Sequence, residues 1–306
     1  MGEVNFIQEG DVQLDTTKAR FLNVLKRHEE LAHRLSRDSD KMVFQRLQRE
    51  FEAACSAQTQ EVILTGEQWN DGLLATIREA VHMEAERKAA EDDADTMHNI
   101  HPFEKITYKV ENKVICCLQG ARIGIQFETS YAGEPCEIYH CILESKSFLE
   151  KMTVLEHTVP FCLPIREAEN DLLSSNAMKF IDHVGDLLQA YVDRRQQVRL
   201  TKELYGNQIK ELYYSLPYHM IEFMLDDYDC KIIVNLRYAN LVSVLPTRVS
   251  VLAWPMQESQ SSNSIPIRLS YAEDALQTMS LPEAYAEIVL NLPQELKQIY
   301  GNKDSD

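Results

Sequence analysis

The pattern of apolar residues changes twice in the same way along the last two thirds of this chain. From His101 onward, segments in which apolar and polar residues alternate precede segments with helical spacing, and the same order returns after Gly206. Alternation with a period of two is typical of half-buried strands, and a period near 3.6 is typical of helices. We therefore predict an α+β protein with two antiparallel sheets, each with helices packed on one face.

The first repeat is predicted to occupy residues 101–206. Expected strands cover 106–110, 114–118, 123–129 and 138–143, with turns at 119–120 and 132–135. Pro160 and Pro164 exclude a central strand, so 159–164 is predicted to be an edge strand or an extended loop. A short helix over 165–173 and a long helix follow, the latter capped by Ser175 or Asn176. Gly206 suits the end of the long helix as its C′ residue.

The second repeat is predicted to occupy residues 207–306. It begins with a short helix over 209–216, which Pro217 ends. Expected strands cover 218–225, 231–238, 241–245 and 248–254. A polar loop over 257–264 and an extended piece over 266–269 lead to helices over 271–279 and 281–292.

The first hundred residues have a different texture. Residues 1–15 are predicted to form a disordered tail, and 16–100 a helical segment with an acidic linker. Phe21, His28, Leu35 and Met42 recur every seven residues, and Val24 and Leu31 lie on the same stripe. Two heptads are too short for a long coiled coil, but they predict a helix that must bury one face.

A second helix is predicted after a break at 56–61. Thr65 and Gln68 form a capping-box pattern, and Trp69, Leu73, Ile77 and Val81 form the apolar stripe behind it. The charged stretch 84–95 has no apolar face. We interpret it as a fraying helix end or an acidic linker.

Composition restricts the partners. The net charge of −17 argues against direct DNA binding or an anionic membrane as the main partner. Between Lys18 and Arg49 there are nine Lys and Arg residues and only four acidic residues. This excess of positive charge indicates a solvated helix face or a local docking surface. No apolar run is long enough for a membrane span, and the N-terminus has no secretory pattern. Seven cysteines in such a chain indicate reduced, mostly buried thiols and a soluble intracellular protein.

Two groups of residues deserve a test as metal sites. His28 and His33 are five residues apart, so on a helix they point about 140° apart and cannot easily bind one ion. Cys136 and Cys141 are also five apart, so on a strand they lie on opposite faces, with His140 beside them. We interpret these cysteines as structural thiols and expect no metal.

Motifs that bind nucleotides or carry out covalent catalysis are missing from the sequence. Neither glycine-rich phosphate loop occurs, and no G-x-S-x-G elbow is present. Asp226, Asp227 and Asp229 lack the glycine and distal glutamate of a calcium loop and indicate a solvated turn. We expect no cofactor and no enzymatic activity, although a catalytic site assembled from scattered residues would leave no such motif.

Four segments resemble the centromere protein O family. They are the strand 123–129, the segment His157-Thr-Val-Pro-Phe-Cys-Leu-Pro-Ile165, the helix through Phe180, Leu188 and Tyr191, and Tyr238-Ala-Asn-Leu-Val-Ser-Val-Leu-Pro-Thr247. The resemblance covers about residues 105–255, and it is the order and spacing of the segments that make it specific. The first hundred residues show no clear match.

The resemblance implies a fold and a cellular place. Family members have tandem RWD domains, which are α+β modules, and belong to the constitutive centromere-associated network of the inner kinetochore. They form a heterodimer with centromere protein P, and the dimer joins subunits of the centromere protein Q and U type. By this resemblance the chain is expected in the nucleus, at centromeres, as a structural subunit that supports chromosome segregation.

Two questions stay open at the level of sequence. The stripe of Phe21, Val24, Leu31 and Leu35 packs either on a partner helix or on the chain's own modules. A different RWD-type adaptor, for example in a ubiquitin-pathway complex, is the alternative function, because fold alone does not fix function.

Overall fold

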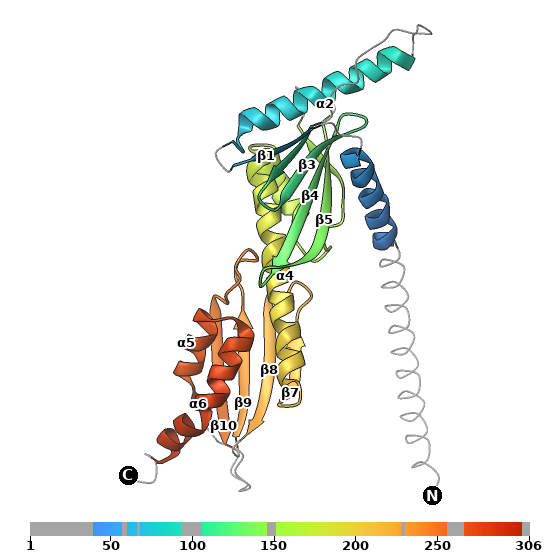
Figure 1. Cartoon of the computed structure of the whole chain (residues 1–306). Coiled ribbons are helices and arrows are strands. Elements are labelled where there is room, and N and C mark those ends of the chain that lie inside the picture. The colour runs from blue at the N-terminus through green and yellow to red at the C-terminus, as the bar shows by residue number, and fades with distance from the viewer. Residues whose placement is uncertain are drawn as a thin grey trace, which may run out of the picture. The chain divides into compact units, whose positions relative to one another are not determined.

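The computed structural model describes residues 39–56, 60–65, 68–92, 106–145, 151–227, 230–255 and 266–301 (Figure 1). The chain divides into two compact units, Met1–Ala57 and Gln58–Asp306. In the first unit a helix covers residues 39–56. The second unit contains two sheets and the remaining described helices, so the α+β prediction is confirmed.

The first sheet has six strands in sequential order. They are β1 (Gln60–Leu64), β2 (Ile106–Val110), β3 (Lys113–Leu118), β4 (Arg122–Tyr131), β5 (Glu134–Glu144) and β6 (Thr153–His157). β1 runs parallel to β2, and every other pair is antiparallel. The predicted turns are present: Gly120 and Gly133 both have positive φ, of 77° and 85°, a conformation that glycine adopts without strain.

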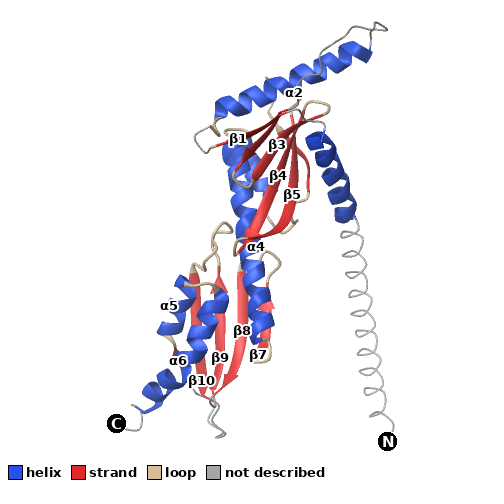
Figure 2. Ribbon diagram, in the orientation of Figure 1, coloured by secondary structure: helices blue, strands red, loops and turns tan. Residues whose placement is uncertain are grey.

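The second sheet has five antiparallel strands in the order β11-β10-β9-β8-β7 (Figure 2). They are β7 (Ile209–Tyr214), β8 (Met220–Asp227), β9 (Cys230–Arg237), β10 (Arg248–Pro255) and β11 (Ile267–Arg268). Two helices follow, α5 (Ser270–Thr278) and α6 (Leu281–Gly301). Their buried side chains join those of the strands in one hydrophobic core.

One long helix belongs to both cores. α4 (Ala177–Tyr205) places Phe180, Val184 and Leu188 in the core of the first sheet and Val198 in the core of the second. Of the two predicted caps, Asn176 is the one the structure uses: its side-chain oxygen accepts a hydrogen bond from the Lys179 N–H at 2.8 Å. The short helix α3 (Ile165–Ala168) and the π-helical stretch η1 (Glu169–Leu173) precede it, as expected for 165–173.

The helix α2 (Asp71–Asp92) packs on the first sheet. Leu74, Ile77 and Val81 are buried in the same core as α4. A polar network reinforces this packing, since Asp182 of α4 accepts from Lys113 Nζ at 2.6 Å and from Trp69 Nε1 at 3.1 Å. The predicted apolar stripe is therefore an internal surface. α2 also extends through most of the acidic stretch 84–95.

The start of α2 differs in detail from the sequence prediction. Thr65 N donates to Gln68 Oε1 at 3.0 Å as a capping box would, yet the helix begins only at Asp71. Asn70 is the functional cap, because its Oδ1 accepts from the Gly72 and Leu73 N–H groups at 3.0 and 3.2 Å. The predicted break at 56–61 overlaps the start of strand β1. This strand forms because its backbone pairs with that of β2.

Two predicted elements of the second repeat are wrong. Residues 209–216 form no helix: Ile209–Tyr214 is the edge strand β7, because pairing with β8 satisfies its backbone. Residues 241–245 form turns and no strand. There Asn240 Oδ1 accepts from Val242 N at 3.1 Å, and its carbonyl accepts from Ser243 N at 3.1 Å, which fixes a local turn.

Other boundaries shifted. α6 continues to Gly301 with Pro293 inside it, where the sequence predicted an end at 292. Strand β6 was not predicted. The segment 159–164 is a loop, as one of the two expectations had it, with Val159 and Leu163 buried and Phe161 exposed. The predicted tail 1–15, the helix over 16–38 and the polar loop 257–264 lie outside the described residues.

Candidate interaction site between α4 and the edge strand β7

Three cations lie on one face of α4. Arg195, Arg199 and Lys202 follow one another at i, i+4 and i+7, a spacing that places side chains in one row along a helix. Gln196 and Val198 lie next to this row. Arg195, Arg199 and Lys202 form the cationic row of α4.

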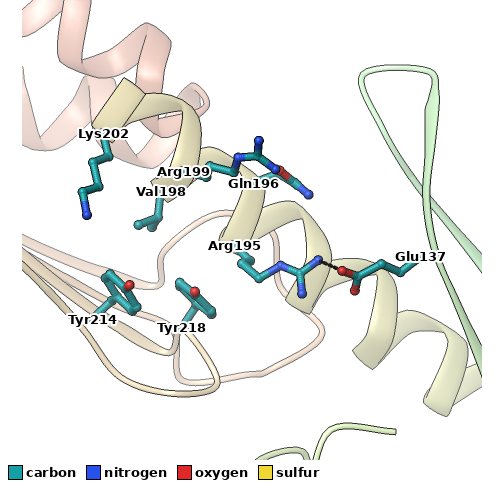
Figure 3. A pocket seen from close by; sticks show the side chains of 8 residues that line it. All are labelled: Glu137, Arg195, Gln196, Val198, Arg199, Lys202, Tyr214 and Tyr218. Carbon is teal, nitrogen blue, oxygen red and sulfur yellow. Dashed lines mark ion pairs between the residues drawn. The ribbon is translucent and has the colours of Figure 1, made fainter. Parts of the chain in front are cut away.

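A cavity of about 350 Å³ lies beside this row (Figure 3). α4 supplies one wall, and Tyr214 at the end of β7 and Tyr218 in the following turn supply another. Glu137 of β5 closes the end nearest the first sheet. The site thus has a basic helical wall facing an aromatic wall.

Arg195 is already engaged by other side chains of the protein. Its Nη2 contacts Glu137 Oε1 at 2.7 Å, and its guanidinium lies 5.3 Å from the centroid of the Tyr191 ring. The Tyr139 hydroxyl donates to the other oxygen of Glu137. Burial opposes the charge of Arg195, but the hydrogen bond and ion pair with Glu137 outweigh it and hold the Arg195 pKa above its usual value. Burial and then the bond to Glu137 raise the pKa of Tyr139, which keeps its hydroxyl a donor.

The other two cations are more available. Arg199 Nε contacts Glu203 at 2.9 Å, but both side chains are more than half exposed, and such surface pairs contribute little. Lys202 is exposed and has no ion pair within the described part of the chain. Both can therefore receive an incoming anion.

The aromatic wall is a stacked pair. The rings of Tyr214 and Tyr218 lie 4.9 Å apart at 12°, and Tyr191 meets Tyr218 edge-on at 5.8 Å. Burial, followed by the neighbouring Tyr214 and Tyr191, raises the pKa of Tyr218 to about 12. Its hydroxyl stays protonated at neutral pH. Tyr218 has φ of 53°, a left-handed value that is uncommon for a tyrosine. The backbone of this turn is therefore in an unfavourable conformation, which its surroundings must stabilise.

A buried arginine fixes the loops behind the site. Arg194 is fully buried, and its Nη1 donates to the carbonyls of Leu241 and Ser243 at 2.7 and 2.6 Å. Nη2 donates to the Pro217 carbonyl at 3.3 Å, and the guanidinium lies over the Tyr238 ring. Burial lowers the pKa of Arg194. This one side chain therefore ties the turn carrying Tyr218 and the turn over 241–245 to α4.

β7 is an edge strand of the second sheet. It pairs with β8 on one side, and its other edge has no strand partner among the described residues. Ser215 N donates to Met220 O of β8, and since N–H groups alternate along a strand, the Tyr214 N–H points to the open edge. Tyr213 and Leu216 are exposed here.

None of the site candidates proposed from the sequence is among the described residues that line this cavity. Phe21, Val24, Leu31 and Leu35 are outside the described residues, as are His28 and His33. Cys141 is fully buried on β5, and Cys136 lies half-buried near its start. Within the described ranges no three His, Cys, Asp or Glu side chains are placed to hold a metal ion. None of the described helices combines the length and hydropathy of a membrane span.

The cationic row and the buried Arg194 were missed at the level of sequence. A signal existed, since Arg194 follows Tyr191 by three residues and precedes Val198 by four, and so lies on the helix face that these two core-packing residues share. Its partners are carbonyls of turns far along the chain, which no local pattern identifies. The resemblance did include the turn, because Tyr238–Thr247 was one of its segments.

The fold and the site together define an α+β protein in which one helix unites two sheets and carries a surface of charged and aromatic side chains. The family model of the Cenp-O kinetochore centromere component matches residues 106–299, which is more than half of the chain. The chain belongs to this family of kinetochore components. The resemblance seen in the sequence is confirmed and extends through most of α6. No curated protein matches the chain in a direct search.

Proposed function

We propose that this chain is a non-catalytic structural subunit of the inner kinetochore, within the constitutive centromere-associated network in the nucleus. The observation that carries the proposal is the family match over residues 106–299. The matched residues run from β2 into α6 and so include most of both sheets and all of α4. The chain would support kinetochore assembly and chromosome segregation.

The two sheets with their helices would be tandem RWD modules, over 101–206 and 207–306. The order of elements supports this, because in each case antiparallel strands precede the helices that bury their faces. β1 and α2 precede the first module in sequence and pack on it. A determined structure of either module would test these boundaries.

The partner would be a centromere protein P homologue, in a heterodimer that joins subunits of the centromere protein Q and U type. The test is co-expression of the full chain with this homologue, followed by size-exclusion chromatography with light scattering. A stable one-to-one complex is expected. A chain that remains monomeric beside the homologue at micromolar concentration would contradict the pairing.

The helix stripe of Phe21, Val24, Leu31 and Leu35 would pack on a partner helix. Replacing Leu31 and Leu35 by Glu should weaken co-purification of the Q and U type subunits and leave the stability of the isolated chain unchanged. If the double variant instead lowers that stability, the stripe packs on the chain's own modules.

Centromere localisation of a tagged chain separates this function from that of an RWD-type adaptor in another assembly.

A further inference from the structure

The second sheet has an open edge next to a basic cavity. An unpaired edge strand presents N–H and C=O groups that a peptide can pair with, and proteins usually block such edges with charge, proline or cover. β7 (Ile209–Tyr214) contains no proline, its two charged residues Lys210 and Glu211 lie near its start, and its last residue forms a wall of the cavity. An added strand would therefore run past the cationic row of α4.

Side-chain direction links the edge to the cavity. Leu212 packs on the core, and Tyr214 lies two residues further along the strand, hence on the same face. Side chains on that face of an added strand would stand beside Tyr214. Figure 3 shows Lys202 above the Tyr214 ring, with the two tyrosines opposite α4.

The charges that line the cavity favour an acidic ligand. The whole chain carries −17, yet this wall has three cations in a row. Glu137 is already engaged by Arg195 and Tyr139, while Lys202 has no anionic partner among the described residues. Carboxylates on an incoming strand would meet Lys202 and Arg199 and accept from the tyrosine hydroxyls.

We propose that the open edge of β7 and the cavity beside it bind an extended acidic segment of a protein partner. The segment adds a strand to the second sheet through the N–H and C=O groups of β7. Its alternate Glu or Asp side chains contact Lys202 and Arg199. This site is additional to the heterodimer proposed above and does not depend on it.

The experiment uses the full chain and a fluorescein-labelled peptide of eight alternating Glu and Val residues, followed by fluorescence anisotropy. A peptide of alternating Lys and Val controls for charge. A third peptide keeps the Glu-Val sequence but is N-methylated at every second residue, so it cannot donate hydrogen bonds along one edge. We expect the first peptide to bind with a sub-millimolar Kd, and the two control peptides to bind at least tenfold more weakly.

Charge reversal locates the site on the protein. Lys202→Glu should weaken binding of the Glu-Val peptide by about five- to tenfold, which corresponds to about 1 kcal/mol. Lys179→Glu is the matched control, because Lys179 is an exposed lysine near the other end of the same helix. It makes the same change in net charge and should leave the Kd within about twofold.

Three results would overturn the proposal. The first is no binding of the Glu-Val peptide at millimolar concentration. The second is an equal loss of affinity in Lys202→Glu and Lys179→Glu, which would indicate attraction to net charge alone. The third is binding of the N-methylated peptide as tight as that of the parent, which would exclude strand addition. Because Lys202 is exposed in the last turn of α4, Lys202→Glu should lower the thermal stability of the chain only slightly, so that a loss of binding does not reflect unfolding.

Discussion

The guanidinium of Arg194 donates to the carbonyl of Ser243 at 2.6 Å, across 49 residues of sequence. The same nitrogen donates to the Leu241 carbonyl, and the second terminal nitrogen donates to the Pro217 carbonyl. A guanidinium can serve three carbonyls in fixed directions, whereas an ammonium concentrates its donors at one point. The ordered conformation of the turn at Pro217 and of the turn over 241–245 therefore depends on an arginine at this position.

Arg194→Lys should destabilise the chain by about 2 kcal/mol, since buried carbonyls would lose their donors and a charge would stay buried. Urea unfolding followed by circular dichroism measures the change. Arg199→Lys, on the exposed side of the same helix, should stay within about 0.5 kcal/mol. Equal effects of the two substitutions would show that the carbonyls find other donors.

Gly206 ends α4 for a reason that the sequence did not give. A C′ glycine was expected, which usually has positive φ, but here φ is −57°. A Cβ at this residue would lie 2.4 Å from the Lys202 carbonyl oxygen, to which the Gly206 N–H donates at 3.0 Å. Glycine is needed here because the backbone approaches closely.

Gly206→Ala should therefore cost about 1–2 kcal/mol, because the last turn of α4 must shift away from the new methyl group. Chemical denaturation measures it. Gly185→Ala is the control, since a Cβ there would lie at an ordinary 3.5 Å from the Phe127 ring and helix propensity favours alanine inside α4. A Gly206→Ala chain as stable as the unchanged one would mean that the turn relaxes without loss.

Periodicity predicted the parts of the fold in which each residue's environment follows from its neighbours. The strands β2, β4, β8 and β9 alternate strictly enough to be identified, and Asn176 precedes a helix as a cap should. The segment KELYY in β7 has no such pattern: its tyrosines favour a strand, while lysine, glutamate and leucine suit a helix. Pairing with β8 decided it, and pairing is a long-range interaction.

The candidate site was out of reach of sequence reasoning for the same reason. Lys202 and Tyr214 lie on different elements, and only the fold brings them to one cavity. In the sequence Arg194 is one of several charges along a predicted helix, and only the fold brings its partner carbonyls to it. The segment 238–247 is part of the family resemblance, but the sequence predicts a strand over 241–245, whereas binding of Arg194 depends on the turn found there.

Glu273 should make stability depend on pH. Its Oε1 accepts from the Val251 N–H at 3.1 Å, and both oxygens accept from Arg268 at 2.6 to 2.9 Å. Burial opposes the charge, but these bonds outweigh it and hold the Glu273 pKa below its usual value of 4.5. The carboxylate therefore stabilises the folded chain above about pH 4.5, and that contribution is lost as the pH falls through the lower folded pKa.

Glu273→Gln should be less stable than the unchanged chain by about 1–2 kcal/mol at pH 7, with the gap narrowing toward pH 3. Thermal unfolding across pH 3 to 8 measures it. Asp274→Asn, at the exposed next residue, should show no comparable gap at pH 7. A constant difference between Glu273→Gln and the unchanged chain at every pH would show that the effect is steric.

The cysteines should divide sharply in reactivity. The thiolate is the reactive form of cysteine, and burial raises the pKa of Cys141 to about 12, so at pH 8 this thiol is both protonated and inaccessible. Cys55 is exposed. Brief treatment of the native chain with iodoacetamide at pH 8, followed by peptide mass spectrometry, should modify Cys55 and leave Cys141 unmodified, whereas in urea both should react. Modification of Cys141 at the rate of Cys55 in the native chain would mean that β5 opens to solvent on the timescale of labelling, and the first core would then be far less stable than its packing indicates.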